Sequence, residues 1–278
     1  MAKKNEVSTH RILILGASGF IGNSIYKELS PYFKVFGTYR TPKKEFQKNR
    51  QFFEYKIDED DIFEILEICK PSIVISALRG DFNFLTIVHH HIFDYVKNHD
   101  CKIIFLSSSN VFDAYSKYPS YEEDKTFSLS KYGLFKIKIE NLFLRLPQKK
   151  ATILRLPMVF GVNSPRIMEL KELISQKEAI EIFPNLIVNI AFEKKLTQQI
   201  HYIINRNKSG IFHLGSSDLI HHEDFIKDIV KLLGYESVSY KNVYTTNDER
   251  YLAVLPKFNK LPKHLHITTE EILEELFK

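Results

Sequence analysis

Three glycines, at positions 16, 19 and 22, constrain the fold more than any other feature of the sequence. They follow the apolar run Arg11–Leu15, which has the length of a buried strand, and they open the helically spaced segment Ile21–Leu29. A strand, a tight turn and a helix in this order begin a strand–helix–strand unit. In such a turn the first glycine permits the sharp bend, and the third lets the helix pack closely on the sheet.

The alternation of strands and helices continues through the first half of the chain. Further strands are predicted at Phe33–Thr38, Phe52–Lys56, Ser72–Ser76, Lys102–Leu106 and Thr152–Leu156. Helices are predicted between them at Asp60–Cys69, Asp81–Lys97 and Ser130–Leu146. Because strand–helix–strand connections are right-handed, this alternation predicts an α/β, Rossmann-type, doubly wound parallel sheet with helices on both faces.

The pattern changes after Leu156, where Pro157, Gly161 and Pro165 interrupt it. Residues 1–156 are therefore predicted to form a dinucleotide-binding domain. Residues 157–278 are predicted to form a smaller, mostly helical substrate-binding lobe. Whether segments of this lobe, such as Ile211–Leu214, return to the sheet is left open.

Composition excludes several classes of function. The net charge of +5 is spread among interspersed acids and bases, so no nucleic-acid partner is expected. Met1–His10 is polar and the apolar run after it stops at Gly16, so we expect no membrane segment and a cytoplasmic location. Cys69 and Cys101 are expected to be reduced core residues. The run His89–His91 falls in a predicted helix, where consecutive side chains diverge, so no metal site is expected.

The glycine turn presents free backbone N–H groups at a helix N-terminus, which is suited to the diphosphate of a dinucleotide. The predicted cofactor contacts in this loop are Gly16, Ser18, Gly19, Phe20, Ile21 and Gly22. Proteins that prefer NAD place a carboxylate about 20 residues further on. Here that neighbourhood has no acid, and Thr38 and Arg40 are suited to a 2′-phosphate instead, so NADP (NADPH) is predicted over NAD. Asp58 is predicted either to accept from the adenine amino group or to cap the following helix.

Tyr132 and Lys136 lie four residues apart, so on a helix they share one face. A nearby ammonium favours the phenolate and lowers the pKa of a tyrosine from its usual value of about 10 toward neutrality, which suits proton transfer. Ser108 precedes the tyrosine by 24 residues and ends the fifth predicted strand. The order of these groups after a glycine turn predicts hydride transfer between a nicotinamide cofactor and a carbonyl.

With these motifs the chain resembles the extended short-chain dehydrogenase/reductases, and within them the dTDP-4-dehydrorhamnose reductase branch. The segments that carry the resemblance are the glycine loop, Leu106–Asp113, Tyr132–Lys136, Ile153–Gly161 and Gly210–Gly215. The resemblance implies that Tyr132 is the acid/base group, that Lys136 also holds the nicotinamide ribose, and that Ser108 orients the carbonyl.

The chain departs from the family pattern around this site. Arg79 stands close after Ala77, in the stretch that lies beside the cofactor in the family. Asn110 replaces a family tyrosine, and Phe135 replaces a small serine. The candidate substrate-binding residues are Arg79, Asn110, Asn163 and Arg166. Arg250 lies in the same half of the chain as Asn163 and Arg166, where cations and amides could meet a nucleotide-sugar diphosphate.

The expected function is NADP-dependent reduction of a keto nucleotide sugar, with the proton coming from Tyr132. Two alternatives stay open: a nucleotide-sugar epimerase or dehydratase, and a non-catalytic NADP-binding sensor. The substrate is expected to be a small molecule, and a homodimer is left open as the assembly.

Overall fold

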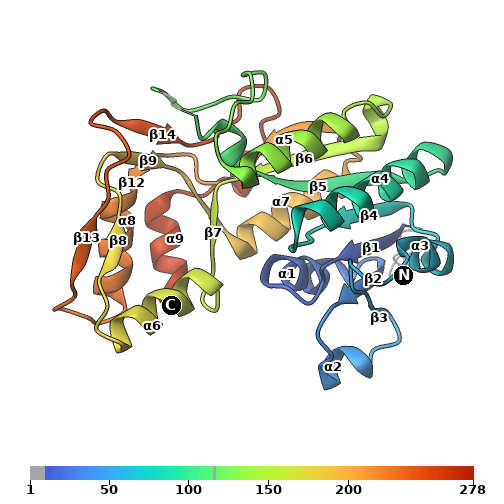
Figure 1. Ribbon diagram of the computed structural model, residues 1–278, viewed down its shortest axis with the longest axis horizontal. Coiled ribbons are helices and arrows are strands. Elements are labelled where there is room, and N and C mark those ends of the chain that lie inside the picture. The colour runs from blue at the N-terminus through green and yellow to red at the C-terminus, as the bar shows by residue number, and fades with distance from the viewer. Residues whose placement is uncertain (1–9, 115–116) are drawn as a thin grey trace, which may run out of the picture. The chain divides into compact units, whose positions relative to one another are not determined.

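The computed structural model describes residues 10–114 and 117–278, so the polar segment Met1–His10 lies outside the described residues except for His10. A seven-stranded sheet has the order β11-β6-β5-β4-β1-β2-β3 (Figure 1). Its strands are β1 (Arg11–Leu15), β2 (Lys34–Tyr39), β3 (Phe52–Glu54), β4 (Ile73–Ser76), β5 (Lys102–Ser108), β6 (Ala151–Leu156) and β11 (Gly210–His213). Strand β1 pairs in parallel with β2 and β4, β2 with β3, and β4 with β5. The predicted doubly wound α/β fold is confirmed.

The chain divides into two compact units that interleave along the sequence. The first comprises the described part of Met1–Leu106 together with Lys138–Ile153 and Ile200–Gly210. The second comprises Ser107–Ile137, Leu154–Gln199 and Ile211–Lys278, without residues 115 and 116. The predicted boundary at residue 156 falls close to the crossing after Ile153, but the second unit also takes the segment that contains Ser108 and Tyr132.

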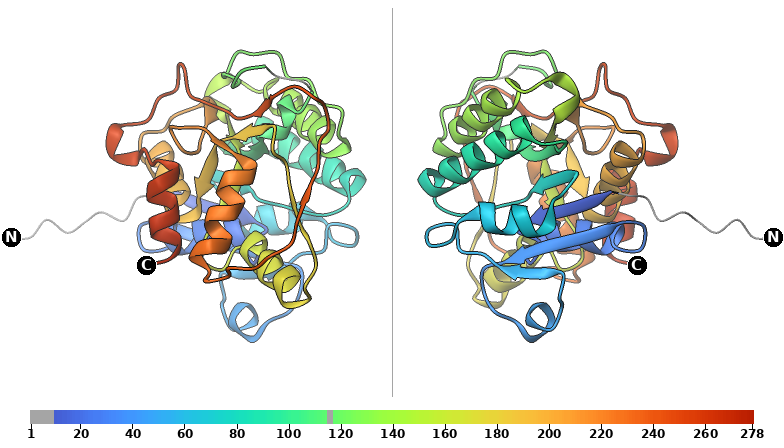
Figure 2. Two further views of the ribbon diagram at one scale, coloured as in Figure 1. Left: turned by 90° about the vertical axis from the view of Figure 1, so that its left-hand side faces the viewer. Right: turned by 90° about the vertical axis from the view of Figure 1, so that its right-hand side faces the viewer.

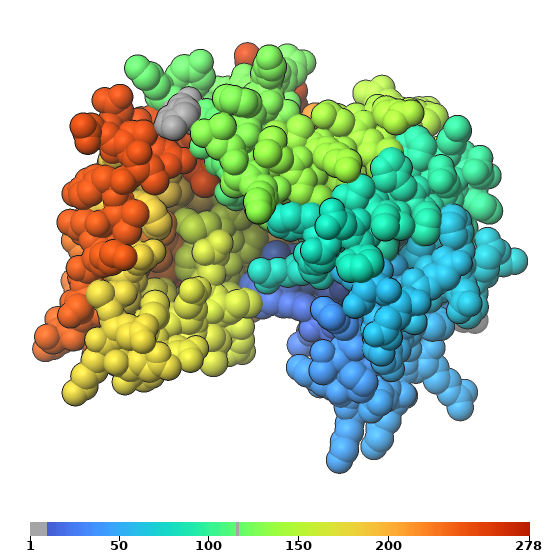
Figure 3. Space-filling view, in the orientation of Figure 1, coloured from blue at the N-terminus to red at the C-terminus, as the bar shows by residue number. Residues whose placement is uncertain are grey.

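In the first unit the helices are α1 (Phe20–Leu29), α2 (Lys44–Gln47), α3 (Ile62–Cys69) and α4 (Phe82–Asn98). Helices α3 and α4 lie side by side (Figure 1). Asp61 caps α3 and Asp81 caps α4, because each carboxylate accepts N–H bonds from the first turn. Helix α2 is too short for its spacing to be recognised in the sequence, and its segment protrudes from the surface in the space-filling view (Figure 3).

Two helices, α5 (Lys131–Phe143) and α7 (Glu193–Asn205), begin in residues of the second unit and end in residues of the first. Within the first unit, His201 of α7 pairs with Glu28 of α1 at 2.7 Å. This bond holds the end of α7 against α1.

The second unit contains helices and several short strands. The helices are α6 (Pro165–Ser175), α8 (His222–Leu232) and α9 (Thr269–Leu276), and a 3-10 turn spans Ser109–Phe112. The strands are β7 (Met158–Phe160), β8 (Ile180–Ile182), β9 (Leu186–Val188), β10 (Ile190–Phe192), β12 (Ile220–His221), β13 (Tyr240–Asn242) and β14 (Arg250–Leu252). They form the small sheets β10-β7, β12-β9-β14 and β13-β8.

A buried cluster that includes Phe160, Phe225, Ile229 and Ile272 forms the core of the second unit. Helices α8 and α9 lie side by side over it (Figure 2). Thr268 and Glu271 form the capping box that begins α9. Because strands of two or three residues show no readable periodicity, the sequence did not predict these small sheets.

Of the cysteines and histidines that stood out in the sequence, Cys69, Cys101 and His89 lie in the core of the first unit. Cys69 and Cys101 are buried, and burial raises the pKa of each thiol to about 12. His89 is buried between Ser76 and the rings of Phe105 and Phe143, whereas His90 is exposed. None of the described helices is both long enough and apolar enough to cross a membrane.

Candidate active site

The glycine loop of the first unit has the geometry that its sequence predicts. Gly16 has φ of +81°, a conformation that side chains disfavour. A Cβ on Gly22 would lie 2.2 Å from the carbonyl oxygen of Gly16, so only glycine lets α1 start this close to β1. Gly19 precedes α1 without a side-chain cap. The first N–H groups of α1 are therefore available to an anion.

Thr38 supports this loop from β2. Its hydroxyl oxygen accepts the N–H of Gly16 at 2.8 Å, and its carbonyl accepts the N–H of Ser18 at 3.2 Å. The side chain is buried, so its observed role is to hold the loop. Its predicted contact with a 2′-phosphate stays a prediction.

The other predicted cofactor residues of the first unit follow its strands. Arg40 is exposed directly after β2, and Ala77 follows β4, where its N–H bonds to the carbonyl of Leu15. Arg79 is exposed two residues further on. Asp58 does not cap α3, because Asp61 occupies that position, so only its predicted adenine contact remains.

The predicted catalytic residues Ser108, Tyr132 and Lys136 all belong to the second unit. Ser108 ends β5, and its hydroxyl donates to Asn110 Oδ1 at 2.9 Å while accepting the N–H of Asn110 at 3.2 Å. Asn110 therefore orients the Ser108 hydroxyl. Both residues are predicted site residues, but the sequence does not predict this pairing between them.

Tyr132 and Lys136 lie on α5, as predicted from their spacing. The Lys136 Nζ lies 5.5 Å from the centre of the Tyr132 ring. Tyr132 is 41% exposed, whereas Lys136 is 7% exposed. The arrangement leaves the phenol accessible and keeps a cation beside it in a desolvated place, where charge interactions are stronger.

The start of α5 is held by a polar cap. The Ser130 hydroxyl accepts the N–H of Gly133 at 3.0 Å and donates to the carboxylate of Asp113. The same carboxylate accepts the N–H of Leu129 at 2.8 Å. Arg250 donates to the carbonyl of Asp113 at 3.1 Å and to Thr245 at 2.6 Å, so its observed role is to brace this cap.

Gly133 sets how closely α5 approaches the turn that follows Ser108. A Cβ at this position would lie 2.0 Å from Ser128 Oγ and 2.3 Å from the carbonyl oxygen of Asn110. The glycine therefore brings the residue next to Tyr132 against the backbone of Asn110. The sequence does not predict this role of Gly133, because the atoms it meets belong to residues that are not its neighbours in the chain.

Arg155 contacts Phe112 of the turn that follows Ser108, and His213 contacts Arg155. Sequence reasoning missed both roles. The buried Arg155 guanidinium lies 4.9 Å from the centre of the Phe112 ring and donates to the carbonyl of Glu122 at 3.1 Å. It lies 3.3 Å from Nε2 of His213, whose Nδ1 donates to the carbonyl of Leu255. Burial and then the charge of Arg155 lower the pKa of His213 to about 4, so the imidazole is neutral and accepts from Arg155.

Phe135, which stands where the family has a small residue, is buried, and the Lys136 Nζ lies 5.8 Å from its ring centre. Its side chain therefore packs into the protein and lines part of the lysine's surroundings.

Asn163 and Arg166 lie where α6 begins. Asn163 is exposed in the turn, and Ser164 caps the helix by accepting the N–H of Ile167 at 3.4 Å. Arg166 is exposed, with its guanidinium 6.0 Å from the centre of the Phe160 ring. The predicted contact of these residues with a substrate stays a prediction.

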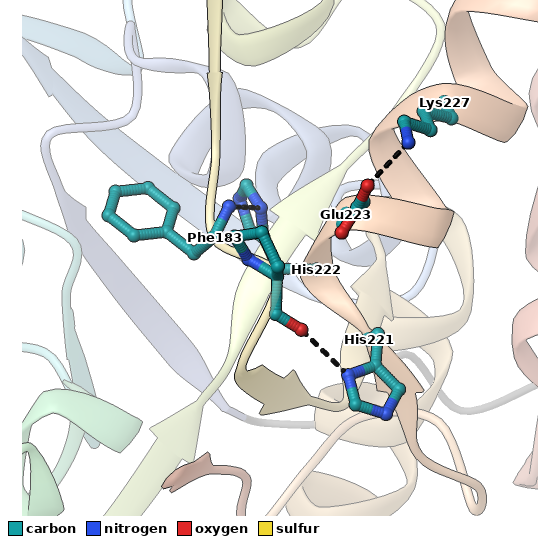
Figure 4. Close-up of polar contacts among 6 residues, drawn as sticks. Phe183, His221, His222, Glu223 and Lys227 are labelled. Carbon is teal, nitrogen blue, oxygen red and sulfur yellow. Dashed lines mark hydrogen bonds and ion pairs between the residues drawn. The ribbon is translucent and has the colours of Figure 1, made fainter. Parts of the chain in front are cut away.

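The buried side chain of His222 interacts electrostatically with Arg166. Nδ1 of this buried side chain accepts the N–H of Phe183 at 3.4 Å, and its ring stacks edge-on against that of Phe183 (Figure 4). The neighbouring His221 donates to the carbonyl of Pro184 at 3.0 Å. These two bonds join the start of α8 to the turn between β8 and β9.

His222 is expected to make the stability of the protein depend on pH. Burial, and then the charge of Arg166, lower its pKa from 6.5 to about 4. Between about pH 6.5 and pH 4, His222 is therefore protonated in the unfolded chain but neutral in the folded protein. The free energy of unfolding is therefore unaffected by the titration of this group above pH 6.5. As the pH falls from 6.5 to about 4, it decreases by roughly 1.4 kcal/mol per pH unit. Urea unfolding across this interval measures the loss.

A His222→Asn variant keeps an acceptor for the N–H of Phe183 but cannot titrate. Its free energy of unfolding is expected to vary less with pH than that of the wild type. His90→Asn, at an exposed position, should leave the pH dependence unchanged. Equal slopes for wild type and His222→Asn would contradict the assignment.

Comparisons with known proteins agree with this architecture. The family described as RmlD substrate binding domain matches residues 86–272. A dTDP-4-dehydrorhamnose reductase from Aggregatibacter actinomycetemcomitans is 24% identical over 270 residues, which cover 88% of each protein.

Solved structures resemble the chain over nearly its whole length. That of a Bacillus anthracis dTDP-4-dehydrorhamnose reductase in complex with NADP gives a TM-score of 0.75 at 17% identity, covering 97% of this chain and 99% of that one. A dTDP-glucose 4,6-dehydratase from the same organism, in complex with NAD, gives a TM-score of 0.78 at 17% identity and covers 96% and 94%. At these identities the structures establish the fold.

Proposed function

The chain belongs to the RmlD substrate binding domain family, and from this membership we propose that it is an NADP-dependent reductase of a 4-keto nucleotide sugar. The family match also confirms the resemblance to the extended short-chain dehydrogenase/reductases that the motifs indicated. The observation that carries the proposal is the set Ser108, Tyr132 and Lys136 in one unit, with the lysine ammonium beside the phenol. Membership of this family also supports a small-molecule substrate.

The residues of the first unit fit a dinucleotide. The positive φ of Gly16, the space that Gly22 leaves free and the uncapped N-terminus of α1 support a diphosphate at this loop. The exposed guanidinium of Arg40, after a strand that ends without a carboxylate, supports NADP over NAD. When bound, the nicotinamide ring supplies the hydride.

The three catalytic side chains have separate roles in this proposal. Tyr132 holds the proton on its hydroxyl and delivers it to the carbonyl oxygen as that oxygen gains negative charge. Lys136 stabilises the phenolate that remains. The Ser108 hydroxyl, which donates to Asn110 in the structure, turns to donate to the substrate oxygen. Asn110 can then keep Ser108 in place through the bond from its backbone N–H.

The proposal is tested by following the loss of NADPH absorbance with a panel of 4-keto nucleotide sugars. We expect turnover with at least one member and a lower KM for NADPH than for NADH. Binding of NADPH without turnover on any member would overturn the reductase and favour a sensor. Purification of the protein with tightly held oxidised cofactor would instead favour an epimerase or dehydratase, because those reactions regenerate the cofactor within each cycle.

A further inference from the structure

The second unit contains a cavity of about 590 Å³ to which none of the predicted site residues contributes. Its volume is within the range of small-molecule sites. The walls come from Gln199 of α7, from the end of β11 and the turn after it at 213–217, and from the segment 255–261. Tyr121 and His266 complete the lining. All these residues belong to the second unit, so the cavity is formed within that unit.

The charged side chains that line this cavity are all cationic. Lys257 and Lys260 line it, and no aspartate or glutamate is among its lining residues. Within residues 10–114 and 117–278, neither lysine has a carboxylate within ion-pair distance. The Lys257 Nζ lies 5.2 Å from the centre of the Phe258 ring and 5.9 Å from that of Tyr121. Both ammonium groups are thus available to a ligand.

The carboxylate that contacts this wall is bonded to its backbone. Glu122 is 5% exposed and accepts the backbone N–H groups of Lys257 at 2.8 Å and Asn259 at 3.1 Å. Despite burial, these bonds lower the pKa of Glu122, so it is ionised at neutral pH. The carboxylate therefore anchors the segment that carries both lysines, and its hydrogen bonds are already made to the backbone.

The remaining polar groups of the lining divide into occupied and available ones. His213 is neutral and bonded at both nitrogens, and Gln199 donates to the carbonyl of Leu265 at 2.9 Å. The Tyr121 hydroxyl has no hydrogen-bond partner among the described residues. Leu255, Pro256 and Leu261 supply apolar surface. Two cations, a free hydroxyl and an apolar wall suit an organic anion.

We propose that this cavity is a second ligand site, which binds a small organic anion through Lys257, Lys260 and the hydroxyl of Tyr121. Phosphate monoesters and carboxylates share the chemistry that the two lysines recognise. The apolar residues cover the uncharged part of the ligand. The site is separate from the proposed reductase activity, and its test does not depend on turnover.

The test measures the melting temperature of the full chain against increasing glycerol 3-phosphate, acetate and glycerol. A saturable rise with an anion, and none with neutral glycerol, supports the proposal. A rise with glycerol 3-phosphate alone identifies phosphate as the recognised group, and a rise with acetate as well identifies negative charge in general. No rise with either anion, or an equal rise with glycerol, overturns it.

Variants connect the effect to this cavity. The double variant Lys257→Ala/Lys260→Ala changes exposed side chains and is expected to weaken the apparent affinity by about tenfold or more. The matched control Lys171→Ala/Lys231→Ala removes the same charge from exposed positions outside the cavity and should leave the affinity unchanged. Tyr121→Phe is expected to weaken binding to a smaller extent. An unchanged affinity in the Lys257/Lys260 variant would place the anion elsewhere and overturn the proposal.

Discussion

Tyr132→Phe is expected to lower kcat by about 10²–10⁴-fold, because it removes the proton that the reduced carbonyl oxygen must receive. The phenyl ring of the variant keeps its place beside Lys136, whose Nζ lies 5.5 Å from the centre of the Tyr132 ring in the wild type. NADPH affinity and the melting temperature should therefore change little. Steady-state kinetics with the substrate identified by the panel, together with fluorescence titration of NADPH, measure the two effects separately.

Tyr244→Phe is the matched control, since Tyr244 is another exposed tyrosine of the second unit and is not among the predicted site residues. It should retain the wild-type kcat. If Tyr132→Phe stayed within a few-fold of wild type, another group would have to supply the proton. A fall in activity with a parallel loss of NADPH binding would contradict a role confined to proton delivery.

Gly133→Ala is expected to destabilise the protein by about 1–3 kcal/mol or more, because the new methyl group has no space. The nearest atoms include the carbonyl oxygen of Asn110, 2.3 Å from the added Cβ, and a backbone atom cannot turn aside. Helix propensity alone predicts the opposite sign, a gain of up to about 1 kcal/mol on replacing glycine by alanine. Urea unfolding therefore distinguishes the two effects by sign.

The same substitution is expected to lower kcat beyond the effect on stability, since it pushes Tyr132 away from the turn that carries Ser108 and Asn110. Leu134→Ala is the control on the same helix, because that side chain is exposed and its truncation creates no clash. It should change both stability and kcat only slightly. A stabilised and fully active Gly133→Ala variant would mean that the close approach of α5 to this turn is not required.

The elements of the sheet could be predicted because each is defined by its own residues. Arg11–Leu15 is a strand with the predicted ends, and α4 begins one residue after the predicted start because Asp81 caps it. Several acids precede α3, and their order along the chain does not tell which one caps the helix. The folded backbone selects Asp61, whose carboxylate reaches the N–H of Phe63 at 2.9 Å.

At the candidate site, spacing along one element was sufficient to predict that two side chains share a helix face. Tyr132 and Lys136 share one face of α5 because four residues make about one helical turn. The supporting groups could not be found in this way. Arg155 and His213 come from β6 and β11, and their contact exists only once these distant segments have folded together.

The sequence by itself determined the strand–turn–helix glycine loop, the order of the sheet elements in the chain and the helical pairing of Tyr132 with Lys136, since each depends on residues close in sequence. Tertiary structure decided that Thr38 holds the glycine loop and that Gly133 fits against Asn110. It also decided that Lys257 and Lys260, which have no ion-pair partner among the described residues, line a cavity beside β11. These features require atoms from separate segments to meet, and the packing of the folded chain determines which segments do so.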